Sequence, residues 1–333
     1  MQDNLPISII IAAHNEEKNI TKKIVSILSQ SYQTEKLQII IASDGSTDQT
    51  VNLAQAFDNP CITVLDLPRA GKTSTLNTAF AYAENDIVVF TDADNQWEVS
   101  TLEHLLRPFS SAEVGASAGQ MIIPNSGKSL SLGDSLYRHY ESWIRAVENK
   151  TGCMVSADGA LLALRKELFQ TIPLDVNDDF FLSTCAPVNG KKIIYVENAK
   201  VIDEGVDEVD KQYRRRIRVT VGGLKSLAAR RELLNPFKHK LYAIALISHK
   251  LIRRLSPLCL IPLLISNFFI RDIHIFYTCT LYLQLISYGL AIAGLLDSQG
   301  RLPKIFRIAG YILITLIGMT VGCWEFLTGK KYS

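Results

Sequence analysis

Two carboxylates follow a strongly apolar segment of the chain. Residues Ile87 to Phe90 form an uninterrupted apolar run, which predicts a strand buried on both faces of a sheet. Asp92 and Asp94 come directly after it, one residue apart. In open α/β sheets the ligand crevice lies outside the carboxyl ends of the strands, and Mg²⁺ or Mn²⁺ binds carboxylates together with substrate phosphates. The pair is therefore a candidate metal site, and a solvated turn is the alternative while the motif stands alone.

Polar residues also follow the two strands that the sequence predicts earlier, at residues 7–13 and 38–43. Asn15 and Glu16 come after the first of these strands, and Asp44 begins the turn after the second. Strands that alternate with helical segments predict a parallel, doubly wound α/β sheet with right-handed crossovers. Because the carboxyl ends of parallel strands lie at one edge of a sheet, these polar residues are expected to converge with the carboxylate pair.

A lysine in the next loop offers a positive charge. Gly71 and Lys72 resemble the end of a phosphate-binding P-loop, but the position five residues before Gly71 is Asp66 instead of glycine, which excludes that motif. Lys72 is instead expected to act as a single cation near a nucleotide. The alternative is an exposed loop lysine.

Further acids lie in the second half of the α/β region. Asp158 precedes the conformationally free Gly159, and it is expected either to face a substrate hydroxyl or to cap a turn. Asp178 and Asp179 fall in the first turn of a predicted helix. The helix dipole alone would favour acids there by roughly 0.3–1 kcal/mol each, so a purely structural role is a real alternative.

One long helix is predicted over residues 130–149. The apolar residues along one of its faces are Leu132, Leu136, Tyr140, Trp143 and Val147. We expect this face to pack into the core, as helix stripes of this kind usually do.

A basic cluster follows at residues 211–218. Arg215 and Arg218 are spaced to share a helix face, and Arg214 and Arg216 lie beside them. The planar guanidinium fork binds phosphate oxygens in pairs, so the cluster is expected to hold a diphosphate. A membrane-proximal helix facing anionic lipid is the alternative.

The bulk composition excludes some classes of protein. The 333 residues carry a formal charge of only +2, so no global field indicates a nucleic-acid partner. No signal peptide is expected, because the chain runs straight into its first strand. The six cysteines show no paired metal spacing, which fits buried thiols in a reduced compartment.

The last third of the chain is strongly apolar and predicts membrane association. We divide the chain into a catalytic domain at 1–235, an amphipathic interfacial helix at 236–254 and a transmembrane region at 255–333 with two or three spans. The segments 275–296 and 305–327 have the roughly 20 apolar residues that a spanning helix needs. The segment 255–270 contains two prolines and either spans or re-enters.

The charges that flank these segments predict an orientation. If the first segment spans, the basic groups at 250–254 and 301–307 fall on one side. The positive-inside rule makes that side the cytoplasm, which would also hold the catalytic domain of a multi-pass protein of the cell (inner) membrane. Lys330 and Lys331 fall on the other side, a mild violation.

Taken together, these motifs resemble family 2 glycosyltransferases. The seven blocks that carry the likeness, in chain order, are 7–17 with 39–48, then 71–77, 91–95, 156–165, 177–183 and 212–218. More narrowly they look like the membrane-bound branch that includes cellulose, hyaluronan and poly-N-acetylglucosamine synthases. The resemblance implies a GT-A fold, an inverting mechanism, a divalent cation (Mg²⁺ or Mn²⁺) and a nucleotide-diphosphate sugar, with a UDP-sugar as the first expectation.

The resemblance also implies roles for particular residues. Those that match the nucleotide-sugar-binding blocks are Ala13, Asn15, Glu16, Asp44, Lys72, Asp92, Asp158, Arg215, Arg216 and Arg218. Asp94 matches the direct metal ligand, with Asp92 as its partner. Asp179 matches the general base in the block read here as Asn177-Asp178-Asp179. Residues 215–219 align with the family's Gln-x-x-Arg-Trp motif.

Departures from the family pattern bear on the product. His14 stands where tyrosine is usual, and Arg215 and Val219 replace the glutamine and tryptophan of the last motif. In processive synthases that tryptophan stacks near the acceptor sugar, so its absence weakens a polymer interpretation. We expect transfer to a membrane-associated lipid or saccharide acceptor in cell-envelope or exopolysaccharide synthesis. The alternatives are a processive polysaccharide synthase, a sugar nucleotidyltransferase and a non-catalytic membrane scaffold.

Overall fold

The computed structural model describes residues 5–32, 37–122, 129–157, 159–203, 209–297 and 301–329. The chain forms two compact units. The first, which we call the α/β unit, comprises residues 1–124, 141–204 and 230–245, and the second, the helical unit, comprises 125–140, 205–229 and 246–333.

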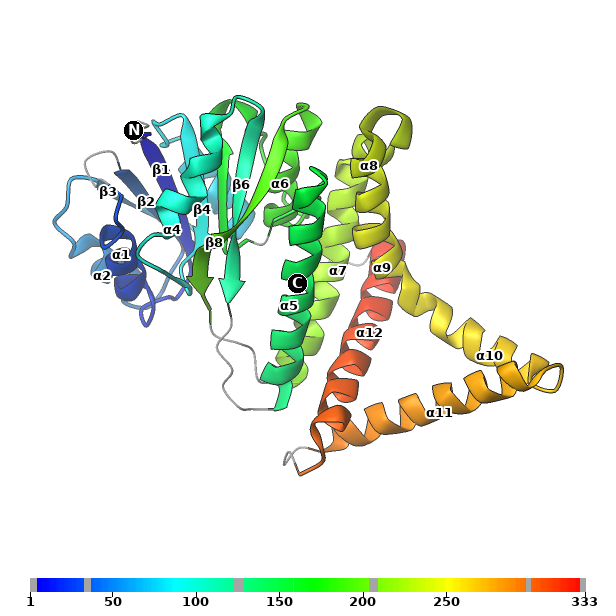
Figure 1. The fold of residues 1–333 in the computed structure, drawn as a ribbon. Coiled ribbons are helices and arrows are strands. Elements are labelled where there is room, and N and C mark those ends of the chain that lie inside the picture. Colours follow the sequence, from blue (N-terminus) through cyan, green and yellow to red (C-terminus); the bar gives the residue numbers. More distant parts are fainter. Residues whose placement is uncertain are drawn as a thin grey trace. The chain divides into compact units, whose positions relative to one another are not determined.

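The α/β unit is built on one mixed sheet with the strand order β3-β2-β1-β4-β7-β6-β8-β5 (Figure 1). The strands are β1 Ile7–Ala13, β2 Leu37–Asp44, β3 Ile62–Leu67, β4 Ile87–Asp92, β5 Gln96–Trp97, β6 Val114–Ile122, β7 Leu161–Arg165 and β8 Lys192–Ile202. The first four strands pair in parallel, and β7 runs antiparallel to β4 and β6. The predicted doubly wound, mostly parallel sheet is therefore confirmed.

Helices cover both faces of this sheet. They are α1 Ile20–Leu28, α2 Thr50–Gln55, α3 Lys72–Phe80, α4 Thr101–Leu106 and α6 Asp178–Val188. Alternate residues of the central strands feed two separate cores: Ile9 belongs to the core with α1, α2 and α4, and Ile10 to the core with α3 and α6. This burial on both faces explains why β1 and β4 are almost wholly apolar. The carboxyl ends of β1, β2 and β4 lie side by side because these strands pair in register.

The long helix α5 Ser129–Lys150 differs from its prediction. Leu136, Tyr140, Trp143 and Val147 are 44–64% exposed, so the expectation that they pack into the core is wrong. The side chain of Leu132 lies outside the described residues. The inward positions are polar or charged instead: Glu141 and Arg145 are buried and form an ion pair. The helix is thus turned so that its charged residues pair inside and its apolar stripe remains exposed.

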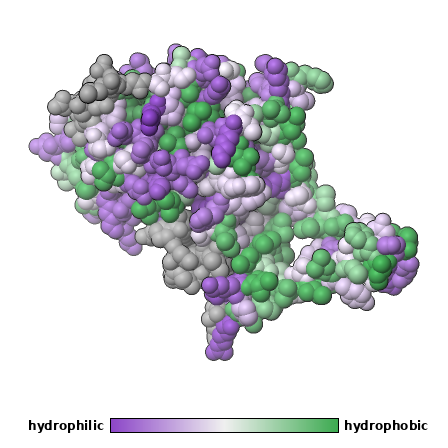
Figure 2. Space-filling model, viewed as in Figure 1, coloured by the Kyte–Doolittle hydropathy of each residue, from purple (hydrophilic) through white to green (hydrophobic). Residues whose placement is uncertain are grey.

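The helical unit contains the apolar third of the chain. Its main helices are α7 Val209–Ala229, α9 Arg253–Leu255, α10 Leu260–Ile270, α11 Ile275–Leu296 and α12 Lys304–Thr328, and α8 Pro236–Leu246 leads into it. Among the described residues, three helical runs are long and apolar enough to cross a membrane: Pro236–Ile270, Ile275–Leu296 and Lys304–Thr328. Hydrophobic side chains gather over these helices, while hydrophilic ones dominate the visible face of the α/β unit (Figure 2).

Within the helical unit, α12 packs closely on α7 through small residues. A Cβ added at Gly318 would lie 2.8 Å from Cβ of Arg216, and one at Gly322 would lie 2.7 Å from Cβ of Thr220. Glycines spaced four residues apart let two helix backbones approach in this way. The contact fixes the face of α7 that carries Arg216 against the last helix of the chain.

Candidate active site

The loops after β1 and β2 are joined by hydrogen bonds between polar side chains and backbone groups. Asn15 adopts a positive φ of 56°, and its Oδ1 accepts a hydrogen bond from the backbone N–H of Thr47 at 2.9 Å. The backbone N–H of Glu16 donates to Oγ1 of Thr50 at 2.7 Å. Short polar side chains tolerate the left-handed region, which explains an asparagine at position 15. The buried Ala13 ends β1 just before this junction.

Asp44 holds the loop that leads into α3. Its Oδ1 accepts hydrogen bonds from the backbone N–H groups of Ala70 at 2.7 Å and Gly71 at 2.9 Å, and its Oδ2 lies 2.6 Å from Nη1 of Arg69. Burial alone would raise the pKa of Asp44, but these donors and the guanidinium charge together lower it. The carboxylate is therefore a stable anion that fixes the position of the loop.

Lys72 joins two carboxylates from different elements. Its Nζ lies 2.6 Å from Oδ1 of Asp92, at the end of β4, and 2.9 Å from Oδ2 of Asp178, at the start of α6. Partial burial would lower the pKa of Lys72, but Asp178 and Asp92 raise it well above its ordinary value. The same ion pair lowers the pKa of Asp178, against burial, which would raise it. The site thus contains one firmly charged ammonium between two anions.

Asp94 is less well compensated than its neighbours. Burial and then the charge of Asp92 raise its pKa. Burial also raises the pKa of Glu16, and the charges of Asp94 and Asp92 add to that effect. The negative charges of Glu16, Asp92 and Asp94 therefore repel one another at the carboxyl ends of β1 and β4. Among the described residues no group of three acids, histidines or cysteines is arranged to hold a metal ion, so Asp92 and Asp94 would hold Mg²⁺ or Mn²⁺ together with substrate phosphates.

Asp179 lines the same small cavity as Lys72, Asp92 and Asp178. Gly159 forms part of the wall, where an added Cβ would lie 3.3 Å from Cβ of Asp179 and 3.7 Å from Oδ2 of Asp92. The missing side chain at position 159 leaves room for both Asp92 and Asp179 beside this wall. Asp179 also accepts a hydrogen bond from the backbone N–H of Phe180 at 2.7 Å, which fixes its carboxylate at the first turn of α6.

The predicted site residues divide into three groups by their position. The structure brings together, in the α/β unit, Ala13, Asn15, Glu16, Asp44, Lys72, Asp92, Asp94 and Asp179. Asp158 lies outside the described residues. Arg215, Arg216 and Arg218 lie on α7 in the helical unit, and their binding of a diphosphate stays a prediction.

The structure also shows what surrounds Arg216. Its side chain is 9% exposed, its guanidinium lies 4.4 Å from the ring centroid of Tyr137, and Nη2 is hydrogen-bonded to the hydroxyl of Tyr311. All three residues belong to the helical unit. Stacking of a guanidinium on aromatic rings stabilises the packing of α7, so Arg216 has a structural role whatever else it does.

Sequence reasoning missed several residues of the site. Asp178 was assigned no role of its own, and its ion pair with Lys72 depends on a contact between residues far apart in the chain. The ion pair of Arg69 with Asp44 likewise joins two segments that are separate in the sequence. In the separate helical unit, the buried Gln212 stands three residues before Arg215 on α7 and gives the literal Gln-x-x-Arg spacing, and its role in sugar transfer stays a prediction. That literal spacing was the available signal.

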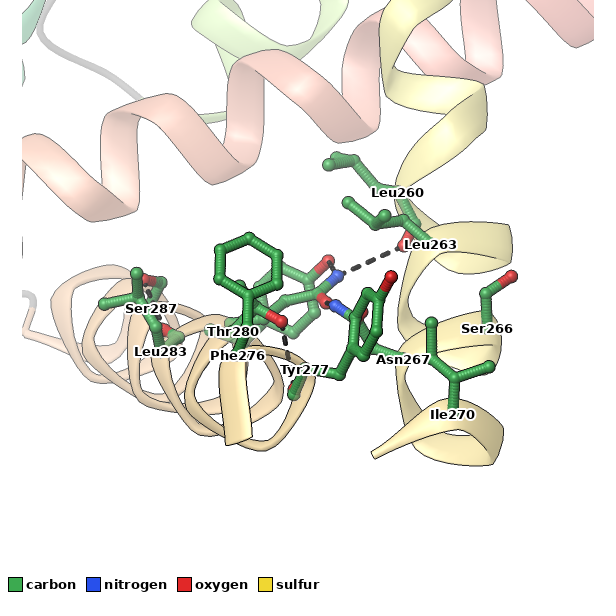
Figure 3. Close-up of a pocket in the computed structure, with 12 residues that line it drawn as sticks. Leu260, Leu263, Ser266, Asn267, Ile270, Phe276, Tyr277, Thr280, Leu283 and Ser287 are labelled. Atoms are coloured by element: carbon green, nitrogen blue, oxygen red, sulfur yellow. Dashed lines mark hydrogen bonds between the residues drawn. The ribbon is translucent and has the colours of Figure 1, made fainter. Parts of the chain in front are cut away.

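A larger cavity of about 560 Å³ lies elsewhere, between α10 and α11 (Figure 3). Its walls mix apolar side chains with Asn267, Gln284 and Tyr288, and Gln284 donates hydrogen bonds to the hydroxyl of Tyr288 at 2.7 Å and to the carbonyl of Leu260 at 3.3 Å. None of its lining residues is charged. It therefore offers no acid, base or metal ligand of the kind found beside β4.

Comparison with known proteins shows which proteins the α/β unit is similar to. Residues 8–170 match the model of a protein family described as Glycosyl transferase family 2. "Probable glycosyltransferase YdaM" of Bacillus subtilis is 30% identical over 137 residues, which cover 39% of this chain and 33% of that protein. "Glycosyltransferase GlyA" of Streptococcus pneumoniae is 24% identical over 209 residues, 58% of this chain and 30% of the relative. The chain thus spans about a third of the length of these relatives.

A solved structure is similar over almost the whole chain. Mannosyltransferase PcManGT from Pyrobaculum calidifontis, determined in complex with GDP-Man and Mn²⁺, superposes with a TM-score of 0.69 at 22% sequence identity. The match covers 99% of this chain and 89% of that one. At this identity the likeness concerns the fold, and it confirms the predicted GT-A architecture.

Proposed function

We propose, from the match of residues 8–170 to the Glycosyl transferase family 2 model, that the chain transfers a sugar from a nucleotide-diphosphate sugar to a membrane-associated acceptor. The acceptor is a lipid or a saccharide of the cell envelope or of an exopolysaccharide. The observation that carries the proposal is that Asp92, Asp179 and Lys72, which come from three separate elements, line one cavity. Sugar transfer to a hydroxyl needs one carboxylate to hold the metal, a second carboxylate to accept the proton and a fixed cation to stabilise the leaving group.

Asp179 is the proposed general base. It removes the proton from the acceptor hydroxyl as that oxygen attacks the anomeric carbon, while the bond from that carbon to the leaving diphosphate breaks. The configuration at the anomeric carbon inverts in this single displacement. Its carboxylate is fixed by the backbone N–H of Phe180 and by the close approach at Gly159, so it is positioned before the acceptor arrives.

Asp94 and Asp92 are the proposed metal ligands. A divalent cation held there would supply a Lewis acid beside the leaving diphosphate. Lys72 adds a fixed positive charge next to Asp92, and it also holds Asp178 beside the base. PcManGT, the structural neighbour, is described with Mn²⁺ and GDP-Man, which supports a nucleotide-diphosphate donor and a divalent metal for this chain.

The helical unit is proposed to anchor the enzyme in the membrane. If the helical runs that end at Ile270, Leu296 and Thr328 all span, residues 297–303 would fall on the same side as the segment before the first span. Arg301, Lys304 and Arg307 lie in or beside that connection, and basic residues favour the cytoplasmic side. The catalytic domain would then act at the cytoplasmic face of the cell (inner) membrane, next to lipid-linked acceptors.

A donor screen tests the transferase activity. Membranes that contain the chain are supplied with UDP- and GDP-sugars in turn, and release of nucleoside diphosphate is measured with and without Mn²⁺. We expect one donor class to be turned over only when metal is present. Discrete lipid-soluble products would indicate single transfer, a ladder of long products would indicate a processive synthase, and release of pyrophosphate from a nucleoside triphosphate would overturn the proposal.

A substitution tests the base. Asp179→Asn keeps the shape of the side chain but cannot accept the proton, so transfer is expected to fall by roughly 10²–10⁴-fold. Binding of the donor, measured by calorimetry on the purified chain, is expected to stay within about twofold because Asp179 acts on the acceptor. Transfer by this variant at the normal rate would show that another residue is the base.

A further inference from the structure

A lysine occupies a core position beneath the candidate metal ligands. Helix α1 buries Ile20, Lys23, Ile24 and Ile27 on its inner face, and Lys23 is 0% exposed. The spacing of these four residues is that of an apolar helix stripe, so position 23 is where an isoleucine or leucine would be expected. A charged group there must be compensated by specific partners, because burial of an unpaired charge is costly.

The ammonium of Lys23 has three neutral partners. Its Nζ donates to Oγ1 of Thr91 at 2.8 Å and to Oδ1 of Asn95 at 2.7 Å. It also lies 4.8 Å from the ring centroid of Trp97, within the range of a cation–π contact. An ammonium has three protons, which equals the number of these partners.

Thr91 and Asn95 bracket the candidate metal ligands in the sequence. Both also bond to one backbone group: Oγ1 of Thr91 donates to the carbonyl of Ala160 at 2.7 Å, and Nδ2 of Asn95 donates to the same carbonyl at 3.3 Å. The network therefore joins both ends of the segment 91–95 to each other and to the residue after Gly159. Because Gly159 faces Asp92 and Asp179, this network lies directly behind the candidate active site.

The electrostatics of Lys23 agree with this geometry. Burial lowers its pKa to about 7, while the charges of Asp92, Asp94 and Asp203 act in the opposite direction. In return, the positive charge of Lys23 lowers the pKa of Asp94, although burial and Asp92 outweigh it. The lysine and the candidate ligands therefore interact through the loop without touching.

We propose that Lys23 is a positioning residue for metal binding: through Thr91 and Asn95 it holds Asp92 and Asp94 in the arrangement that a divalent cation requires. This inference rests on the proposed function, since it assumes that the two aspartates are the metal ligands. Groups that orient metal ligands without touching the metal typically account for roughly 10–100-fold in metal affinity. An apolar side chain at position 23 would fill the same space but would remove the two hydrogen bonds that Lys23 donates to the ends of the loop.

The test compares Lys23→Met with Lys22→Met. Methionine keeps most of the length of the lysine side chain without its donors, and Lys22 is the exposed neighbour on the same helix. Binding of Mn²⁺ to each purified full-length variant in detergent is measured by electron paramagnetic resonance of the free ion, with thermal unfolding as a check on folding. We expect Lys23→Met to raise the Kd for Mn²⁺ by roughly 10–100-fold and Lys22→Met to leave it within about twofold.

The sign of the change separates positioning from simple charge. If Lys23 acted only as a nearby positive charge, its removal would strengthen the binding of a dication. An unchanged or lower Kd for Lys23→Met therefore overturns the inference. If this variant does not fold, Asn95→Leu replaces it. That change keeps Lys23 bonded to Thr91, so a smaller rise in Kd is expected and an unchanged Kd overturns the inference.

The wild-type titration separates this inference from the proposed function. If the wild-type chain binds no Mn²⁺, the metal requirement of the proposed function fails and the role of Lys23 fails with it. If the wild type binds Mn²⁺ and Lys23→Met binds it equally well, only the role of Lys23 is overturned.

Discussion

The carboxyl ends of β2 and β4 both present aspartates, but the two ends are built differently. Asp44, at the end of β2, accepts two backbone hydrogen bonds and an arginine, and its pKa is lowered despite its burial. Asp94, two residues beyond the end of β4, is exposed, and partial desolvation together with the charge of Asp92 raises its pKa. Two acids of the same type, at neighbouring places in one sheet edge, therefore have opposite electrostatic states.

This difference shows how a structural acid can be distinguished from a ligand-binding acid. The protein itself satisfies Asp44, so that carboxylate fixes a loop and contributes stability. The negative charge around Asp94 is only partly offset by Lys72 and Lys23. An acid that the fold leaves in this state is a candidate for binding a cation, because strongly perturbed groups cluster at functional sites.

The largest expected effect is on metal binding. Asp94→Asn removes a direct ligand and is expected to weaken Mn²⁺ binding by at least about a hundredfold, or ~3 kcal/mol. Asp44→Asn, at the other strand end, is expected to change it by less than about twofold. Titration of both purified variants with Mn²⁺ checks this. Equal losses in the two variants would remove the distinction between the strand ends.

The stability of the same two variants is expected to change in the opposite order. Asp44→Asn replaces a charged acceptor of the Arg69 and backbone donors and is expected to cost roughly 1.5–3 kcal/mol of unfolding free energy. Asp94→Asn removes repulsion between Asp92 and Asp94, so stability is expected to stay the same or rise. Unfolding in detergent at pH 7 measures both values, and a larger loss for Asp94→Asn would contradict the comparison.

Lys23 gives the β4 end a pH dependence above pH 7, whereas the lowered pKa of Asp44 acts only in the acid range. The pKa of Lys23 is about 7 in the folded chain against an ordinary value of 10.5. Between these two values the unfolded chain binds the additional proton, so folding stability rises with pH. Relative to Lys23→Met, the wild type is expected to gain up to about 1.4 kcal/mol per pH unit above pH 7. Unfolding free energies at pH 7, 8 and 9 test this, and parallel curves for the two proteins would contradict it.

The smallest expected effect concerns Gly159, the residue of the cavity wall that faces Asp92 and Asp179. A methyl group in Gly159→Ala meets Cβ of Asp179 at 3.3 Å, so the base must shift by a few tenths of an ångström. We expect transfer to fall by about threefold to tenfold, since small misplacements of catalytic groups reduce rate. Gly289→Ala in α11 is the control, because its added Cβ meets nothing within 4 Å. Transfer by Gly159→Ala at the wild-type rate would show that the close approach has no catalytic role.

Much of the sheet and the grouping of its polar ends could be predicted because both depend on local patterns. Apolar runs such as Ile87–Phe90 define the strands, and parallel pairing then brings their ends together whatever the intervening loops do. The antiparallel β7 and the pairing of Lys72 with Asp178 could not be predicted, because each depends on contacts between residues far apart in the chain.

Two other failures have a common physical cause. Periodicity shows which residues of a helix share a face, but not which face turns inward. In α5 the apolar stripe with Trp143 is exposed, while Glu141 and Arg145 pair inside. In α1 the inward face includes Lys23, which its charge alone would place on the surface. Both cases depend on partners that only the folded chain provides.

The glycine face of α12 sets a practical limit on how the protein can be shortened. Gly318 and Gly322 lie directly against Arg216 and Thr220, so the final helix covers a side of α7 that would otherwise be bare. A chain that ended before Lys304 would expose that side to detergent or to another molecule. Removing the membrane segments to obtain a soluble enzyme would therefore alter the helix that carries the arginines, and expression trials should retain the whole C-terminus.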